Sequence, residues 1–192
     1  QAWDEDVTTT DYLFRTVPSL SDRYVRFANA IAETARKRGL ELELAAYAYA
    51  NYSDAPSATT VDPSVRIRFV PGEYPADVTM RDTVYAEWDK WREKGAKSMY
   101  WRPNTMYQGN GFPLVYGREI AEGLTHLAER GMLGVNIDSL GGYHATWGPM
   151  AYVVSRRMED LETPIEVFEN EYYDGFGSAR EEVRAYFDFW RG

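Results

Sequence analysis

The sequence contains no cysteine and only two histidines among its 192 residues. The missing cysteine excludes a disulfide framework, a thiolate nucleophile and a cysteine-ligated zinc site, and it leaves the cellular compartment open. Two histidines argue against a histidine-rich metal site, whereas an all-oxygen site for Ca²⁺ or Mg²⁺ stays open. We expect no cofactor and no bound metal.

Positive charge and long apolar runs are also scarce. The chain has 21 Lys and Arg against 30 Asp and Glu, which gives a net charge of −9. Nucleic acid is therefore not an expected partner, because its phosphates require a basic face. The longest apolar run, Leu44 to Ala50 with its tyrosines counted, is too short to cross a bilayer. Motifs of nucleotide-binding loops, zinc proteases and serine hydrolases are absent from the sequence.

Aromatic residues, by contrast, are abundant, with 15 Tyr, 8 Phe and 6 Trp. Aromatic rings stack on the apolar faces of sugars and carboxylates bind hydroxyl groups, so an acidic, aromatic-rich chain suits carbohydrate as a ligand. The alternative, that these rings fill the core, is equally open. The length and an apolar content of 44% fit one folded domain over residues 1–192.

Hydrophobic periodicity predicts an α/β fold. Segments with apolar residues at helical spacing alternate along the chain with short segments of strand periodicity. Tyr24, Phe27 and Ala28 belong to the first helical segment. Long helices between short strands favour parallel pairing with right-handed crossovers. We expect a loop over 1–18, helices over 20–38, 79–94 and 116–130, helices beginning near 149, 163 and 179, and strands over 40–50, 65–70, 97–102 and 132–137.

Several local signals refine these elements. Ser21 is expected to cap the first helix, Thr163 with Glu166 to form a capping box, and Ser178 with Glu181 to cap the last helix. Glycines follow three helices and fit a left-handed backbone. Charges on neighbouring strands are expected to pair, with Glu41 and Glu43 on one strand and Arg66 and Arg68 on the next. In the last helix the residues expected to face inward are Val183, Tyr186, Phe187 and Trp190.

Ligands of parallel sheets bind beyond the carboxyl ends of the strands, so the candidate site is sought there. Three carboxylates are candidate catalytic groups: Asp138 after the fourth strand, Glu73 in the loop after the second, and Asp4 in the acidic opening segment. Asp138 is a candidate general acid or base, or an anchor for a sugar hydroxyl, and its alternative role is to cap its own loop. For Glu73 and Asp4 the favoured alternative is that they are solvated charges.

Candidate substrate-binding groups share these ends. Arg102 is suited to a substrate carboxylate or to an internal acid, and Trp101 and Trp147 are either stacking platforms or core residues. The full set is Tyr47, Tyr49, Tyr100, Trp101, Arg102, Asn104, Asn136, Tyr143, His144 and Trp147.

Two stretches resemble an uncharacterised family of bacterial glycoside-hydrolase-like barrels, the domain of unknown function 4838. The first runs from Ser21 to Ala50, where Phe27 and Asn29 on a helix precede a strand that ends in Ala46 and Tyr47. The second is the closing helical region, where Tyr173, Gly177, Ala179, Ala185 and Tyr186 match.

This resemblance implies a TIM-like barrel related to sugar hydrolases, of which the chain supplies about four parallel strands, the C-terminal half. An eight-stranded barrel takes about 250 residues. Three hypotheses follow: a hydrolase-type site for acidic or acetylated polysaccharide, a non-catalytic carbohydrate-binding domain, and an assembly domain. A half barrel leaves strand edges and an inner face uncovered, so we expect the chain to pair with itself or with a missing N-terminal half.

Overall fold

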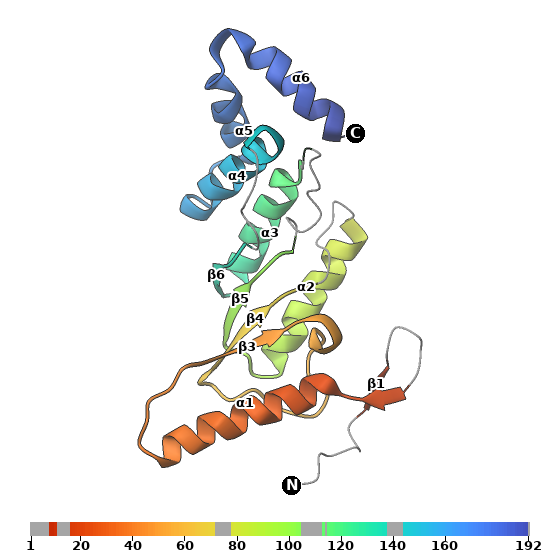
Figure 1. The fold of residues 1–192 in the computed structure, drawn as a ribbon, viewed down its shortest axis with the longest axis vertical. Helices are drawn as coiled ribbons and strands as arrows, with labels where there is room; N and C mark the ends of the chain where they lie inside the picture. Colours follow the sequence, from red (N-terminus) through yellow and green to blue (C-terminus); the bar gives the residue numbers. More distant parts are fainter. Residues whose placement is uncertain are drawn as a thin grey trace.

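The computed structural model describes residues 8–10, 16–71, 78–104, 113, 115–137 and 144–191. Its main body is a four-stranded parallel sheet with helices packed against it (Figure 1). In chain order the elements are β1 (Thr8–Thr10), β2 (Thr16–Pro18), α1 (Leu20–Lys37), β3 (Leu44–Ala48), η1 (Ala50–Tyr52), β4 (Val65–Phe69), α2 (Val78–Glu93), β5 (Ser98–Trp101), α3 (Gly117–Glu129), β6 (Met132–Val135), α4 (His144–Glu159), α5 (Ile165–Asp174), η2 (Gly177–Ala179) and α6 (Arg180–Arg191).

The sheet has the order β3-β4-β5-β6, so each strand pairs with the next one along the chain. All three pairings are parallel, and a register shift lies between β5 and β6. This is the topology of a partial (β/α) barrel, and it confirms the predicted fold class and the order of the four strands.

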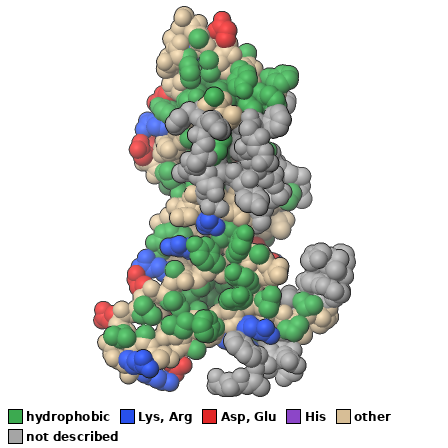
Figure 2. Space-filling view, viewed as in Figure 1, with side chains coloured by type: hydrophobic (Ala, Val, Ile, Leu, Met, Phe, Trp, Pro, Cys, Tyr) green, Lys and Arg blue, Asp and Glu red, His purple; other side chains and the backbone are tan. Residues whose placement is uncertain are grey.

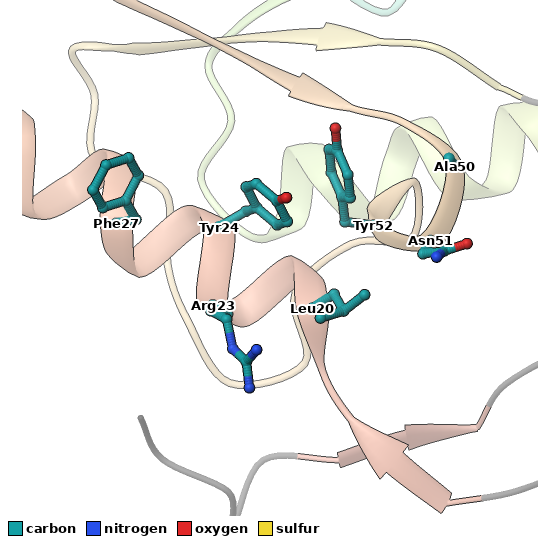
Figure 3. Close-up of a pocket in the computed structure, with 7 residues that line it drawn as sticks. All are labelled: Leu20, Arg23, Tyr24, Phe27, Ala50, Asn51 and Tyr52. Carbon is teal, nitrogen blue, oxygen red and sulfur yellow. The ribbon is translucent and has the colours of Figure 1, made fainter. Parts of the chain in front are cut away.

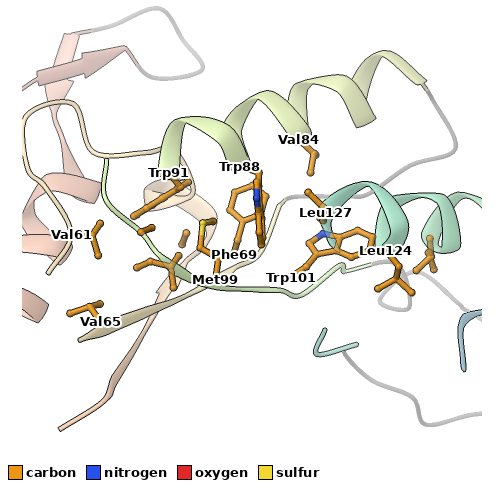
Figure 4. Close-up of a cluster of buried hydrophobic side chains, with 14 of the residues drawn as sticks. Val61, Val65, Phe69, Val84, Trp88, Trp91, Met99, Trp101, Leu124 and Leu127 are labelled. Atoms are coloured by element: carbon orange, nitrogen blue, oxygen red, sulfur yellow. The ribbon is translucent and has the colours of Figure 1, made fainter. Parts of the chain in front are cut away.

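One face of the sheet is buried beneath helices. Val65, Ile67 and Phe69 of β4 face this side, and all three are almost completely buried. In Figure 4, Trp88 and Trp91 of α2 lie over the strand residues, and Leu124 of α3 lies beside Trp101. Trp88, Trp91 and Trp101 belong to one hydrophobic cluster, which also includes residues of α1 and α4. Fully burying side chains of this size stabilises a fold by about 1.5–3 kcal/mol each.

The other face of the sheet stays partly exposed. It carries Tyr47, Arg66, Arg68 and Tyr100, which alternate with the buried residues along their strands. In Figure 1 the helices α4, α5 and α6 continue beyond β6 and α3 at one end of the molecule. They bury two smaller clusters of their own, one around Phe168 and one around Tyr173.

The structure corrects the sequence prediction at several element ends. Residues within the predicted opening loop form a short antiparallel hairpin, β1 with β2. The cap of α1 is Ser19, whose Oγ accepts from the backbone N–H of Asp22, while Ser21 lies inside the helix. Helix α4 begins at His144 and contains Pro149, because Trp147 and Met150 both pack into the core and draw the preceding turn into the helix.

The predicted capping box at the start of α5 is wrong. Thr163 Oγ1 donates to Asp160 instead, and Glu166 binds Arg118 of α3. In α6 only Phe187 is buried; Tyr186 and Trp190 were predicted to face inward and are exposed, since no described element covers that side of the helix.

Candidate functional site

A row of side chains crosses the partly exposed face of the sheet. The register pairs Tyr47 of β3 with Arg68 of β4, Arg68 with Tyr100 of β5, and Tyr100 with Gly134 of β6. Gly134 leaves room for its neighbour, because a Cβ there would lie 3.2 Å from the Tyr100 ring. We name these residues, with Arg102 and Asn136 beyond them, the sheet-face row.

Contacts within the row are polar and aromatic. Arg68 Nη1 donates to the Tyr47 hydroxyl at 3.2 Å, and the guanidinium carbon of Arg68 lies 5.6 Å from the Tyr47 ring centroid. The guanidinium carbon of Arg102 lies 5.8 Å from the same centroid. Two cations therefore lie near one ring, whose negative face attracts them.

Arg102 and Asn136 follow β5 and β6 at the carboxyl end of the sheet. Arg102 Nε donates to Asn136 Oδ1 at 3.2 Å. Asn104 lies two residues further on, and its Oδ1 is buried with no hydrogen-bond partner among the described residues. The predicted convergence of polar groups on this end of the sheet is thus present for Arg102 and Asn136.

Toward the amino end of the strands the face is charge-compensated. Arg66 forms an ion pair with Glu43 and donates to the Tyr100 hydroxyl at 3.2 Å. The hydrogen bond to Glu43 and the charge of that carboxylate raise the pKa of Arg66. The predicted pairing of charges across these strands is confirmed for Arg66 and Glu43.

Trp101 and Trp147 are core residues rather than stacking platforms. Trp101 is 0% exposed and Trp147 is 9% exposed, and both belong to the main core cluster. Trp101 occupies the position on β5 that faces the helices, so its indole cannot present a face to a sugar. Tyr49, just after β3, is exposed and stays a candidate.

The three candidate catalytic carboxylates, Asp138, Glu73 and Asp4, lie outside the described residues, as does Tyr143. His144 is the first residue of α4, and its side chain is likewise not described. Among the described residues no group of carboxylates and histidines is arranged to hold a metal ion. No described helix is long and apolar enough to cross a membrane.

An aromatic hollow of about 410 Å³ lies where the start of α1 meets η1 (Figure 3). The rings of Tyr24 and Tyr52 stack there with centroids 4.1 Å apart. Burial and the nearby Tyr24 and Tyr49 raise the pKa of Tyr52. Tyr24 and Phe27, predicted to share the apolar stripe of the first helix with Ala28, are exposed, because the buried stripe runs through Val25, Ala28, Ala32 and Ala35.

A buried carboxylate, Asp22, joins α1 to the loop that follows β3. Its Oδ1 accepts from the backbone N–H groups of Ala58 and Thr59, and its Oδ2 accepts from Ser57 N–H, Ser57 Oγ and Ser19 Oγ, at distances of 2.6–3.0 Å. Burial alone would raise the pKa of Asp22, but these hydrogen bonds more than offset it and hold the pKa well below the usual range. Sequence reasoning missed Asp22, whose local pattern is that of an ordinary first-turn acid.

Comparison with known proteins gives one match. A family model described as a domain of unknown function, DUF4838, matches residues 9–188. No curated protein and no solved structure matches the chain.

Proposed function

Because the chain belongs to the DUF4838 family of domains of unknown function, we propose that it is a carbohydrate-binding portion of a glycoside-hydrolase-like barrel. One observation carries the proposal: the sheet-face row brings the guanidinium carbons of Arg68 and Arg102 to 5.6 Å and 5.8 Å from the Tyr47 ring centroid. Parallel α/β sheets bind ligands beyond the carboxyl ends of their strands, which is where Arg102 and Asn136 lie.

The row supplies the groups that a sugar requires. The Tyr47 side chain is 41% exposed, so part of its ring is open to a ligand. Arginine provides hydrogen-bond donors only, whereas asparagine provides both a donor and an acceptor, so Arg102 and Asn136 together match sugar hydroxyls that act in both ways.

Hydrolysis by this portion requires two carboxyl groups on either side of the scissile bond. Their separation is about 5–5.5 Å in retaining enzymes and about 6.5–9.5 Å in inverting enzymes. Asp138, Glu73 and Asp4 are the proposed candidates, with Asp138 first because in the sequence it comes three residues after Val135, the last residue of β6. One acid protonates the leaving oxygen, and the other attacks the sugar carbon or activates water.

The test is calorimetric titration of the chain with a panel of neutral and charged oligosaccharides. We expect Tyr47→Ala to weaken binding of the best ligand about tenfold, which corresponds to ~1.4 kcal/mol. Tyr186→Ala is the matched control, because Tyr186 is similarly exposed but lies on α6, away from the sheet. Equal loss in both variants, or no binding of any sugar by the native chain, would refute the proposal.

Hydrolysis is tested separately with the ligand found by titration. If the chain releases reducing ends, Asp138→Asn should abolish the release while leaving binding intact. Binding without release assigns the chain to the alternative, a non-catalytic carbohydrate-binding domain.

A second candidate role, assembly, is favoured by the uncovered sheet face. Parallel sheets almost always have both faces covered, and β3 and β6 are unpaired on their outer edges among the described strands. We therefore propose, as the second candidate role, that the chain pairs with a second copy or with an N-terminal half barrel. Sedimentation of the chain at several concentrations tests for self-pairing, and a monomer at every concentration argues against it.

A further inference from the structure

We propose that Arg68, with Tyr47 and Arg102 beside it, binds the negatively charged substituent of an acidic glycan, a carboxylate or a sulfate. This inference rests on the proposed carbohydrate-binding function and names its ligand class.

The charge of the sheet face is opposite to that of the chain. The whole chain carries a net charge of −9, yet the face presents Arg66, Arg68 and Arg102 beside Glu43. Basic side chains gather over the middle of the molecule in Figure 2, where Figure 1 places the four-stranded sheet. A basic face on an acidic chain indicates that its complement is acidic.

The charge is not spread evenly along the strands. Arg66, toward the amino end, is neutralised by Glu43. Arg68, two residues closer to the carboxyl end, donates to a neutral tyrosine hydroxyl and forms no ion pair with a described residue. A guanidinium keeps its full positive charge and has five N–H donors, so Arg68 retains donors for an anion after its one bond to Tyr47.

The surroundings of Arg68 fit a sugar that bears an acid. Arg68 is partly exposed, and the Tyr47 ring lies next to it in the register. A ring face packs against the apolar side of a pyranose, and a guanidinium donates two parallel N–H bonds to a carboxylate or sulfate. A ring and a fork side by side therefore match one acidic sugar unit, which favours a glycan over the acidic face of a second protein.

The experiment compares three disaccharides that differ only in one substituent: a neutral glucose unit, a glucuronic acid unit and a sulfated glucose unit. Each is titrated calorimetrically into the native chain, Arg68→Gln and Arg66→Gln at low and at moderate salt. Arg66 is the matched control, because it lies on the same strand and face but already has a carboxylate partner. Circular dichroism melting of each variant verifies that it is folded.

We expect at least one acidic disaccharide to bind about tenfold more tightly than the neutral one. This advantage should disappear in Arg68→Gln, persist in Arg66→Gln and shrink as salt is added. The glucuronic acid and sulfate arms distinguish the two sources of charge.

Other outcomes overturn the inference in distinguishable ways. Equal binding of neutral and acidic disaccharides removes the acidic ligand but leaves the proposed carbohydrate binding standing. Binding of none of a wider panel of sugars removes both. Self-association of the native chain that is lost in Arg68→Gln assigns the arginine to an interface with a second copy instead.

Discussion

Replacing Asp22 with asparagine should destabilise the fold strongly, although the two side chains have the same shape. Both carboxylate oxygens of Asp22 accept backbone N–H groups: Oδ1 from Ala58 and Thr59, Oδ2 from Ser57. An asparagine has one oxygen and one NH₂ group, so whichever way it turns, the NH₂ faces at least one backbone donor. The substitution also removes the negative charge that strengthens the remaining bonds.

The magnitude follows from these contacts. An unsatisfied buried donor costs about 1–3 kcal/mol, and a hydrogen bond to a charged group contributes about 1.5–3 kcal/mol. We therefore expect Asp22→Asn to lower the free energy of unfolding by about 3 kcal/mol at pH 7. At about 2–4 °C per kcal/mol for a chain of this length, the melting temperature falls by about 6–12 °C.

The pH dependence provides a second readout. The folded-state pKa of Asp22 is depressed, so its stabilisation is complete above its ordinary pKa of 3.8 and is lost as the pH falls through the folded-state value. The free energy of unfolding of the native chain should therefore fall in acid as Asp22 is protonated. In Asp22→Asn this part of the pH dependence should be missing. Urea unfolding followed by fluorescence of the buried tryptophans, at pH 7 and between pH 4 and pH 2, measures both effects.

Glu33→Gln on the same helix is the control, because Glu33 is exposed and forms an ion pair with Lys37 one turn away. A variant Asp22→Asn that unfolds within about 0.5 kcal/mol of the native chain would refute the reasoning. An unchanged acid dependence would refute the assignment of the low pKa.

Two further predictions compare matched pairs of positions. Gly95 and Gly39 both have a left-handed backbone, with φ of +92° and +69°, but a Cβ at Gly95 would lie 2.9 Å from Thr60 Cγ2 whereas one at Gly39 meets nothing within 4 Å. Gly95→Ala should therefore cost about 3 kcal/mol and Gly39→Ala about 1 kcal/mol in urea unfolding, and equal costs would contradict the crowding argument. Glu169 is 9% exposed and binds Arg118 at 2.5 Å and Arg191 at 3.0 Å, so Glu169→Gln should cost about 2 kcal/mol after allowance for the partial exposure of both arginines. Glu166 is an exposed partner of the same Arg118, so Glu166→Gln should leave the melting temperature unchanged. Equal losses of stability in Glu169→Gln and Glu166→Gln would show that burial of the carboxylate does not determine the cost.

The parallel sheet was predictable because its signals are local and repeated. Alternation over Val65–Phe69 predicts which residues of β4 are buried, and the structure confirms it. The glycines after α1, α2 and α3 also have the expected left-handed backbone. Each of these features depends on residues that are close together in the chain.

Features that depend on distant partners were not predictable. The apolar stripe of α1 was predicted only in part: Ala28 is buried as expected, but Tyr24 and Phe27 are exposed. Aromatic and small residues both recur at helical spacing, and only the packing shows that the small ones face the sheet. The roles of Trp101 and Trp147 were open for the same reason: indole rings suit a core and a binding surface equally. Asp22 joins segments 35 residues apart, so the first-turn pattern around it carries no trace of Ser57.

The separate apolar clusters of α4, α5 and α6 bear on how the chain unfolds. Ala121 of α3 and Val153 of α4 belong to the cluster of Phe168, while their neighbours Ile120 and Val154 belong to the cluster beneath the sheet, so α3 and α4 join the two regions. Amide hydrogens of α5 and α6 should therefore exchange with solvent through partial opening, at a lower free energy than those of β4 and β5. Proteases should accordingly remove α5 and α6 first and leave a resistant sheet covered by helices α1 to α4.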